Sequence, residues 1–431
     1  MTDQVRIFGE HDERTIAQLE RCVAVAEGSV GVLCADGHLG YSQPIGGVVA
    51  YREHVSPSGV GYDIGCGNKA VLTDLVLEQV QPELPRLMDE IVARISFGVG
   101  RNDGRSGDHA VIDEIEDAAF APQRSLRDLA AKQLGTVGAG NHYVDLLADE
   151  QDRVWIGVHF GSRGFGHKTA SGFLALAHGL PFDGRAPEGE MEAPPTLLQI
   201  DGELGAGYIE AMRLAGRYAY AGRDVVCEEV CRILGATALE EVHNHHNFAW
   251  LEQHDGDPAW VVRKGATPAF PGQRGFVGAT MGEPAVILEG VESDRARDAL
   301  YSTVHGAGRA MSRTKAAGKQ RRRWACDNRD CDWVQPPGSH KPETCPACGR
   351  RSLSKRWIQQ EPGLIDFPAV RQDLAARGIE LRGGAADEAP PAYKRLPEVL
   401  AHHAGTVAVL HELRPIGVAM AGAHTFDPYK D

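Results

Sequence analysis

The sequence predicts an α+β fold, built as one large mixed domain with a small insertion. The predicted strands are short and scattered, as in residues 154–159 and in the segment "PAVILEG". Helical spacing of apolar residues covers residues 13–27, 77–95 and 205–234. These helices do not alternate regularly with the strands, as a doubly wound parallel sheet would require, so the pattern favours α+β.

The length and composition indicate a soluble globular protein. The chain has 431 residues, more than one simple core usually holds, so one domain with an insertion or two domains are expected. Hydrophobic residues make up 42% and charged residues 24%, which is ordinary for this class. The chain contains no apolar run of about 18 residues, and the polar start "MTDQVRIFGEHDERT" is unlike a secretory signal. We therefore expect a cytoplasmic protein with no membrane partner.

The charge is acidic overall but locally basic. A formal net charge of -14 disfavours a protein that coats nucleic acid non-specifically, because that affinity comes from Lys and Arg. The segment "RTKAAGKQRRR", residues 313–323, nevertheless carries six basic residues in eleven. The segment is either a solvated loop or part of a nucleic-acid surface, and the sequence leaves both open.

Four cysteines form two close pairs with the pattern C-x4-C-x13-C-x2-C. Nine cysteines in a long intracellular chain favour metal or catalytic roles over disulfides. Two thiolate pairs suit a tetrahedral Zn²⁺ site, and the second pair has the "CPACG" form typical of zinc knuckles. We predict a zinc-ribbon insertion at residues 321–357, which divides a core of residues 1–320 and 358–431. Its ligands would be Cys326, Cys331, Cys345 and Cys348.

A second set of metal-ligand residues stands among glycines. In "GVGYDIGCGN" a carboxylate and a thiol are three residues apart, and further motifs place histidines beside glycine, asparagine or a strand end. Such a mixed S/N/O set suits Mn²⁺, Zn²⁺, Fe²⁺ or Co²⁺ better than Mg²⁺. Two ions bridged by one ligand would clamp phosphate oxygens. The candidates are Asp63, Cys66, His142, His159, His243, His245, His246 and His305.

Phosphate-binding features lie beside these motifs. The glycine-rich "GAGN" and "HGAG" segments expose backbone N–H groups that can cradle phosphate. Four basic residues stand near them and could neutralise phosphate charge. They are Arg163, Lys264, Arg274 and Arg309. The residues therefore point to phosphoryl chemistry at a metal centre: a phosphotransferase, a nuclease or a nucleotidyltransferase.

The motifs resemble, in order, those of the RtcB family of RNA ligases. They include "DGHLGYSQPIGGVV", "GVGYDIGCG", "LGTVGAGNHYVD", "HFGSRGFGH", "HHNFAW", "RKGATPAFPGQRG", "STVHGAGRAMSRTKA" and "PPAYK". The resemblance implies an RtcB-like fold and the joining of RNA 3'-phosphate or 2',3'-cyclic phosphate ends to 5'-hydroxyl ends, in RNA repair or tRNA splicing. It also implies a histidine–GMP intermediate, two Mn²⁺ ions, GTP as cofactor and, in some lineages, the protein archease as partner.

The resemblance also assigns roles residue by residue. His305 takes the place of the nucleophile, and Cys66 that of the bridge between the metals. One ion would bind Cys66, His159 and His246, and the other Asp63, Cys66 and His142. Nucleotide contacts would come from Asn141, Asp145, Asn247, Gly278, Ala279, Thr280, Met281, Gly306, Ala307 and Gly308.

Three positions depart from the family pattern. Asp145 stands where the family has a guanine-reading Glu, Ala285 replaces a serine, and Ala421 replaces a lysine near the chain end. A site discriminates between bases only when its hydrogen-bonding partners are present. GTP is therefore the expected cofactor, with ATP, dGTP or relaxed use as alternatives. A nucleotidyltransferase that caps 3'-phosphate ends of RNA or DNA is the alternative function.

The predicted ribbon departs from the family as well. It follows the nucleophile loop directly, so we expect it near the mouth of the active site. Its basic flanks are consistent with binding of the nucleic-acid substrate, whether RNA or DNA with 3'-phosphate ends. The alternatives are that the ribbon only stabilises the structure or that it binds a protein partner.

Overall fold

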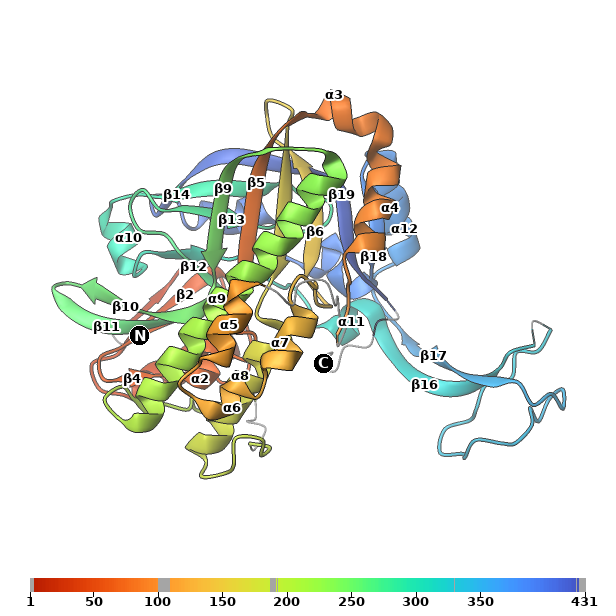
Figure 1. Ribbon diagram of the computed structural model, residues 1–431, viewed down its shortest axis with the longest axis horizontal. Helices are drawn as coiled ribbons and strands as arrows, with labels where there is room; N and C mark the ends of the chain where they lie inside the picture. The colour runs from red at the N-terminus through yellow and green to blue at the C-terminus, as the bar shows by residue number, and fades with distance from the viewer. Residues whose placement is uncertain are drawn as a thin grey trace.

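The structure is a computed structural model that describes residues 4–99, 109–186, 191, 193–328, 330–423 and 425. Two largely antiparallel sheets and the helices around them form one body, from which a thin arm projects (Figure 1). The predicted α+β class is confirmed, because helices do not alternate with parallel strands. Among the described residues, no helix combines the length and the apolar character that crossing a membrane requires.

The larger sheet has eight strands and is antiparallel except at one pair. Its order is β13-β14-β19-β6-β7-β5-β9, and β18 pairs with β19 in parallel. The predicted strand at residues 154–159 lies in β7, and "PAVILEG" forms β14. The strands are β5 (Gly67–Val76), β6 (Tyr143–Ala148), β7 (Arg153–Phe160), β9 (Ala238–His245), β13 (Arg274–Val277), β14 (Ala285–Gly290), β18 (Glu380–Gly384) and β19 (Val407–Gly422).

The smaller sheet has the order β1-β2-β3-β11-β10. Its β1 and β2 run parallel and the other neighbours antiparallel. The strands are β1 (Val5–Ile7), β2 (Val30–His38), β3 (Ile45–Tyr51), β10 (Asn247–His254) and β11 (Asp257–Lys264). Two short pairs complete this region: β12 (Ala266–Pro268) with β15 (Ser302–Val304), and β4 (His54–Val55) with β8 (Leu198–Gln199).

The helices pack around the sheets, and α9 (Glu203–Leu234) is a long one that lies against β5 and β7 (Figure 1). It ends at Gly235, whose left-handed backbone (φ 65°) caps the helix. Asp12 caps α1 (Glu13–Ala24) by accepting from the backbone of Arg14 and Thr15. The remaining α-helices are α2 (Pro57–Val60), α3 (Leu77–Val80), α4 (Leu84–Arg94), α5 (Ala110–Glu116), α6 (Ala121–Arg124), α7 (Arg127–Gln133), α8 (Arg163–Ala177), α10 (Asp294–Asp298), α11 (Arg313–Ala317), α12 (Phe367–Ala376) and α13 (Leu396–Ala401). The described residues also form the 3₁₀ turns η1 (Gln81–Glu83), η2 (Ala386–Glu388) and η3 (Pro390–Ala392).

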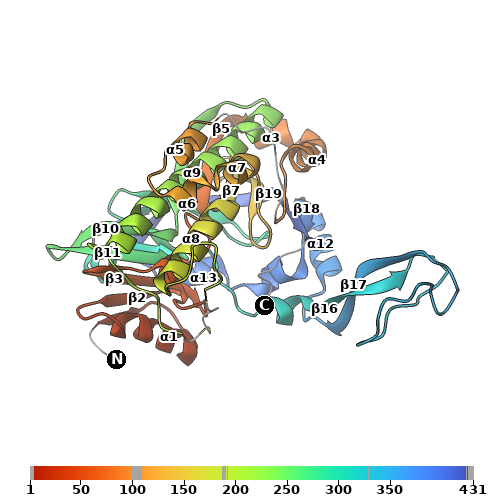
Figure 2. The ribbon, with the colours of Figure 1, turned by 60° about the horizontal axis from the view of Figure 1, so that its bottom comes forward.

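The projecting arm comprises residues 318–362. Its two strands, β16 (Gly318–Cys326) and β17 (Leu353–Pro362), pair with each other from end to end. The arm leaves the body beside α11 and points away from it in both views (Figures 1 and 2). The predicted insertion at 321–357 lies inside this arm. The paired strands extend it by a few residues on each side.

Candidate active site and metal centre

A cleft of about 380 Å³ collects residues from both sheets. The register of the larger sheet explains why distant motifs meet there. Gly67, at the start of β5, pairs with Phe160 at the end of β7 and with His245 at the end of β9. Tyr143, at the start of β6, pairs with His159. Because antiparallel neighbours begin where their partners end, four chain segments converge at one edge of the sheet.

The segment "DIGC" turns sharply at this edge. The amide of Cys66 donates to the carbonyl of Asp63 at 3.0 Å, and Gly65 between them has φ 70°. This is the geometry of a tight turn that needs glycine at its third position. The turn brings the carboxylate and the thiol into the same cleft. A Cβ on Gly161 would lie 2.2 Å from Oδ1 of Asp63, so a second bare position makes room for that carboxylate.

Cys66, His159 and His246 form one group of possible metal donors, with all donor atoms within 4.8 Å of one another. The Nε2 of His159 lies 3.5 Å from Sγ of Cys66. Its Nδ1 donates to Oδ1 of Asn68 at 2.6 Å, which leaves Nε2 facing the thiol. The backbone amide of His246 donates to the carbonyl of Cys66 at 2.8 Å and fixes the third donor beside the first.

Asp63, Cys66 and His142 form a second group, which shares the thiol with the first. The Nε2 of His142 lies 3.2 Å from Oδ2 of Asp63 and 3.7 Å from Sγ of Cys66. Two donors on one tetrahedral ion lie about 3.4 to 3.6 Å apart at ordinary metal–ligand bond lengths. The observed separations match that spacing, so the residues present fit two ions bridged by Cys66.

The electrostatics of these donors also suit bound cations. Burial, with the Asp63 carboxylate nearby, raises the pKa of the Cys66 thiol well above its ordinary value. Burial likewise lowers the pKa values of His159 and His246 far below their usual range, so both imidazoles are neutral. Neutral imidazoles are metal ligands, and a bound cation would deprotonate the thiol.

His305 lies at the same cleft, on the loop after β15. Its Nδ1 donates to Oδ2 of Asp36 at 2.6 Å, and its backbone amide donates to the same oxygen at 2.9 Å. Burial alone would raise the pKa of Asp36, but the facing imidazole holds it below its ordinary value. The carboxylate therefore stays ionised and fixes the tautomer in which Nε2 carries a lone pair. The ring centroid of His246 is 4.9 Å away, so this nitrogen lies beside the metal donors.

The other two histidines of "HNHH" face a different environment. His243 accepts from Nε of Arg223 at 2.7 Å, and Nδ1 of His245 lies 3.0 Å from the carbonyl of Gly65. Both stand around the fully buried guanidinium of Arg223, behind the cleft. Of these three histidines, all within the described part of the chain, His246 is the one that lines the cleft.

The four predicted phosphate-binding residues separate into two groups. Lys264 and Arg309 line the cleft. Burial lowers the pKa of Lys264 to about 8, and its ammonium group donates to the carbonyl of Ser58 at 3.3 Å. Arg309 pairs with Glu388 at 2.8 Å. Both can direct positive charge at a bound phosphate.

Arg163 and Arg274 are not among the residues that line the cleft within the described ranges. Arg163 is partly buried and donates to Thr136 at 3.3 Å and to the carbonyl of Gly98 at 3.2 Å. Arg274, the first residue of β13, is 46% exposed and pairs with Glu240 and Glu289.

The cleft also carries polar atoms that have no partner among the described residues. They are Oδ1 of Asp145, the hydroxyl of Tyr143 and Oγ1 of Thr280, all buried. Burial raises the pKa of Asp145 well above its ordinary value. Unsatisfied buried polar groups in a cleft are costly and mark a place where a polar ligand binds. The expected nucleotide-contacting residues Asn141, Asn247, Gly278, Ala279, Met281, Gly306, Ala307 and Gly308 also line this cleft.

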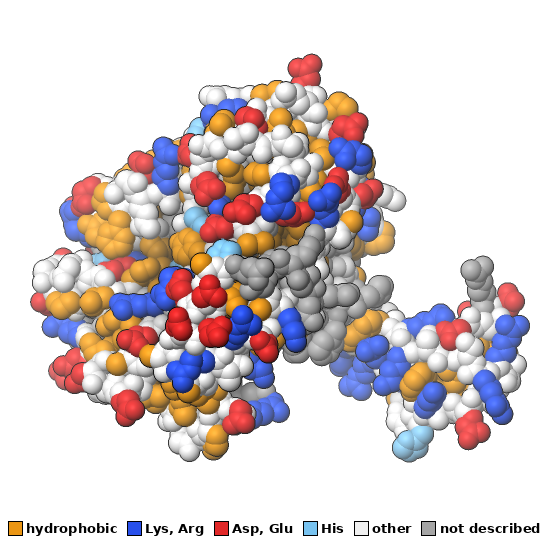
Figure 3. Space-filling model, in the orientation of Figure 1, with side chains coloured by type: hydrophobic (Ala, Val, Ile, Leu, Met, Phe, Trp, Pro, Cys, Tyr) orange, Lys and Arg blue, Asp and Glu red, His pale blue; other side chains and the backbone are white. Residues whose placement is uncertain are grey.

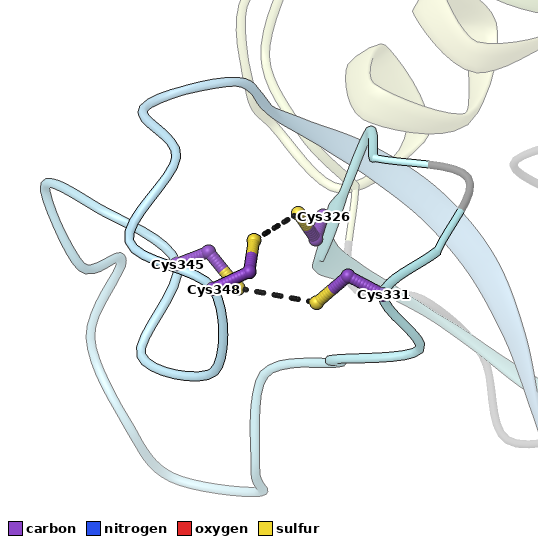
Figure 4. Close-up of side chains that lie close together, drawn as sticks. All are labelled: Cys326, Cys331, Cys345 and Cys348. Carbon is purple, nitrogen blue, oxygen red and sulfur yellow. Dashed lines mark hydrogen bonds between the residues drawn. The ribbon is translucent and has the colours of Figure 1, made fainter.

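The four cysteines of the arm gather at its outer part (Figure 4). The sulfur atoms of Cys326 and Cys348 are 3.5 Å apart, and those of Cys331 and Cys345 are 3.6 Å apart. All four lie within 4.8 Å of one another, close to the separation of about 3.8 Å between thiolates on one Zn²⁺. The geometry fits a small zinc-binding insertion, as the sequence predicts.

Comparison with known proteins agrees with this geometry. The family model described as "tRNA-splicing ligase RtcB" matches residues 16–121 and 110–330. The chain belongs to the RtcB family. It is 30% identical to the tRNA-splicing ligase RtcB of Thermococcus kodakarensis over 94% of this chain and 91% of that protein. It is 33% identical to the RNA-splicing ligase RtcB of Escherichia coli over 65% of this chain and 74% of that protein, and 29% identical to that of Mycobacterium tuberculosis over 89% and 94%.

The departures from the RtcB pattern lie in different places. Asp145 is in the cleft, and Ala421, near the end of β19, follows Met420, which lines it. Ala285 instead packs in a core cluster with Trp155 and Phe276, away from the cleft lining as described. The substitution at Ala285 therefore affects packing of the core, whereas Asp145 is placed to contact a ligand in the cleft.

Four residues of this RtcB site were missed by the sequence analysis. Asp36 orients His305, Asn68 orients His159, and Tyr143 and Arg313 line the cleft. Asp36 and Asn68 stand in the quoted motifs "DGHLGYSQPIGGVV" and "GVGYDIGCGN", so polar residues beside glycine were the available signal. Arg313 lies 3.0 Å from Glu388, which also binds Arg309.

Proposed function

We propose that this protein joins RNA 3'-phosphate or 2',3'-cyclic phosphate ends to 5'-hydroxyl ends through a covalent histidine–GMP intermediate. The observation that carries the proposal is the Asp36–His305 pair, 2.6 Å apart, in one cleft with two donor groups that share Cys66. The relatives named above are tRNA-splicing or RNA-splicing ligases, which supports the same conclusion. RNA repair or tRNA splicing is the proposed setting, and DNA 3'-phosphate ends are a second possible substrate.

We assign the two donor groups to Mn²⁺. Asp63, Cys66 and His142 would hold one ion, and Cys66, His159 and His246 the other. When bound, such ions neutralise phosphate charge and orient the reacting oxygens. In the free protein, Asn68 and the backbone contact of His246 keep the donors facing one another, so little reorganisation is needed on binding.

The nucleophile is Nε2 of His305. Because Nδ1 keeps its hydrogen on Asp36, the lone pair on Nε2 attacks the α-phosphorus of GTP, an N–P bond forms, and pyrophosphate leaves. An oxygen of the RNA 3'-phosphate then attacks the same phosphorus and breaks the N–P bond. A 2',3'-cyclic phosphate end enters this step only after water attacks its phosphorus, which breaks the bond to the 2'-oxygen and leaves a 3'-phosphate and a 2'-hydroxyl. Finally the 5'-hydroxyl oxygen attacks the 3'-phosphorus, GMP leaves, and the hydroxyl proton passes to solvent. Lys264 and Arg309 supply positive charge at the phosphates.

GTP is the proposed nucleotide, with its base beside the unpartnered polar atoms of the cleft. A guanine edge offers N–H donors, and the unpartnered Oδ1 of Asp145 is an acceptor. The side chain of Asp145 is one methylene shorter than the Glu of the family pattern. Discrimination against other bases therefore depends on how closely the base approaches the Asp145 carboxyl group. Capping of 3'-phosphate ends, with altered nucleotide preference, is the second candidate, and the position of Asp145 is what favours it.

Three further assignments belong to this proposal. The arm would bind one structural Zn²⁺ through its four cysteines. We place the protein in the cytoplasm, because all nine cysteines are free of disulfides, as reducing compartments maintain. Archease is the proposed partner if turnover in vitro stops after one round.

The test is nucleotidylation of the protein. Incubation with Mn²⁺ and each α-labelled nucleoside triphosphate should leave an acid-labile, alkali-stable label from GTP above all. The label should vanish in His305→Ala and remain in His411→Ala, whose histidine pairs with Glu150 at the same 2.6 Å outside the cleft. Absence of label with every nucleotide would refute both ligation and capping. Adding RNA with 3'-phosphate and 5'-hydroxyl ends then separates the two, since only a ligase gives a joined product.

A further inference from the structure

The arm differs in charge from the rest of the protein. Residues 318–362 contain ten Lys and Arg against five Asp and Glu, whereas the whole chain has a formal net charge of -14. Lys and Arg side chains gather where the arm leaves the body and along its surface (Figure 3). A basic extension on an acidic body would attract a polyanion to one place.

The strand register sorts the arm's side chains onto two faces. Arg322 pairs with Trp357, and Trp324 pairs with Lys355. Directly opposite residues in an antiparallel pair share a face, as do residues two apart along a strand. These four residues therefore form one surface, which we call the tryptophan face. Arg321 and Ile358, the next pair along, lie on the opposite face.

Cations on the tryptophan face are not neutralised by acids. Arg322 and Lys355 are exposed and form no ion pair with any described residue. The ammonium groups of Lys341 and Lys355 lie 4.2 and 5.5 Å from the ring centroid of Trp324. Positive charge is thus held next to half-buried aromatic rings. A surface on which cationic side chains alternate with aromatic rings suits single-stranded nucleic acid, because its phosphates pair with the cations and its bases stack on the rings.

The root of the arm touches the cleft. Arg313 lines the cleft and begins α11, and Gly318, the first residue of β16, directly follows that helix. At a rise of about 3.3 Å per residue, the nine residues of β16 extend roughly 30 Å from this point. A strand of RNA that leaves the cleft on this side therefore passes along the arm for several nucleotides.

We propose that the tryptophan face binds single-stranded RNA next to the ends that are joined in the cleft. This inference rests on the proposed ligase function and names the part of the substrate that the arm holds. Phosphates of the strand contact Arg322, Lys341 and Lys355, and a base stacks on Trp357. A Zn²⁺ ion held by the four cysteines of the arm would keep the two strands in register, so that this face stays assembled.

An acidic protein partner is the competing occupant. The face carries two half-buried tryptophans among its cations. A carboxylate-rich partner would gain little from these rings, whereas nucleic-acid bases stack on them. The continuity between the cleft and the arm root through Arg313 also favours the substrate over a separate protein. RNA is therefore the occupant that these observations favour.

Two double variants test the proposal as a matched pair. Arg322→Gln with Trp357→Ala alters the tryptophan face, and Arg321→Gln with Ile358→Ala alters the adjacent pair on the opposite face. Binding of a fluorescent RNA of about twenty nucleotides with a 3'-phosphate is measured by anisotropy, without Mn²⁺ or GTP. We expect the first variant to weaken binding about 10-fold or more, with the slope of log K against log salt reduced by about 0.7. The second variant should stay within about 2-fold of the parent.

The remaining readouts separate this inference from the function of the cleft. Zinc content should be unchanged in both variants, and His305 should still be labelled by GTP. Sealing of a long RNA should show a raised KM in the first variant, while sealing of an RNA of about four nucleotides should not change. Equal weakening by both variants, or weakening by neither, would overturn the assignment. If His305 is never labelled but the first variant still loses RNA affinity, the ligase proposal fails and the RNA-binding arm stands.

Discussion

The Nδ1 of His305 donates a hydrogen bond of 2.6 Å to Oδ2 of Asp36, a residue 269 positions earlier in the chain. The same carboxylate oxygen accepts from the backbone amide of His305, so both the ring and the loop that carries it are held. Asp36 is fully buried at the end of β2. Strand β2 and the loop of His305 are far apart in the sequence, but they are joined by these hydrogen bonds. Asp36 on the strand thereby orients the proposed nucleophile.

Replacing Asp36 should therefore impair the first chemical step more than binding. In Asp36→Asn the amide no longer favours the tautomer with hydrogen on Nδ1, and Nε2 loses its fixed lone pair. We expect the rate of His305 labelling by GTP to fall by about 100-fold or more, while the affinity for GTP changes little. Single-turnover labelling and equilibrium binding measure the two quantities separately.

The Asp149 carboxylate offers a control for this variant. It is also buried and satisfied, by Trp155 at 2.9 Å and Arg153 at 2.7 Å, but it lies outside the cleft. Asp149→Asn should cost stability without a specific loss of labelling. If Asp36→Asn labels His305 at the rate of the parent, the orienting role of Asp36 is wrong.

The sequence predicted candidate metal donors, but not the residues that orient them. Asp63, Cys66, His142 and His159 are candidates by residue type and neighbours, whereas the resemblance to the family selected His246 over His243 and His245. The strand register brings the five candidates together. The partnership of Asp36 with His305 depends on how β2 packs against a distant loop, and no local pattern encodes that packing.

The surroundings of Arg274 were not predicted from the sequence. It stands in the chain beside a glycine-rich loop, which suggested a phosphate contact, and in the structure its side chain pairs with Glu240 and Glu289. Proximity in sequence to a motif does not fix the side of a strand on which a residue lies, because successive side chains point to opposite faces.

The class of fold was predictable because it depends on element order, which is a property of the sequence pattern.

Cys66 belongs to both donor groups, so its removal should act on both ions. We expect Cys66→Ala to lose both Mn²⁺ sites, His142→Ala to lose the one it shares with Asp63, and His246→Ala to lose the other. Equilibrium dialysis followed by elemental analysis gives the metal content of each variant. Cys227→Ala is the matched control, because this cysteine is buried in a core cluster away from the donors. Loss of a single site in Cys66→Ala would contradict the bridging role.

The Asp145 carboxyl group should lower the stability of the free protein at neutral pH. Burial raises its pKa in the folded protein above the unfolded value, so the folded state keeps a proton that the unfolded state releases. The free energy of unfolding contributed by this group therefore falls as pH rises from about 4 towards neutrality. Asp145→Asn should remove this loss and stabilise the free protein by about 1–3 kcal/mol at pH 8, with little difference near pH 4.

The same substitution should weaken selectivity among nucleotides. The amide of Asp145→Asn offers one acceptor and two donors, so the preference for GTP over ATP in His305 labelling should drop by about 10-fold. Asp145→Glu extends the carboxylate by one methylene and should sharpen that preference. Thermal unfolding at the two pH values and competitive labelling measure these effects. An unchanged GTP to ATP ratio in both variants would exclude Asp145 from base recognition.

Removal of the arm's metal should unfold the arm and leave the body intact. The arm has few buried apolar side chains, and its four cysteine sulfurs lie within 4.8 Å of one another, so the ion would replace a hydrophobic core. Cys345→Ser should lose one zinc per chain and expose the arm to proteolysis, while the body keeps its melting transition. Because Gly318 and Pro362 are paired neighbours, residues 319–361 can be replaced by a short glycine linker without stretching the body. That variant should still label His305 with GTP. Loss of labelling in a variant whose body still melts cooperatively would show that the arm contributes to the cleft itself.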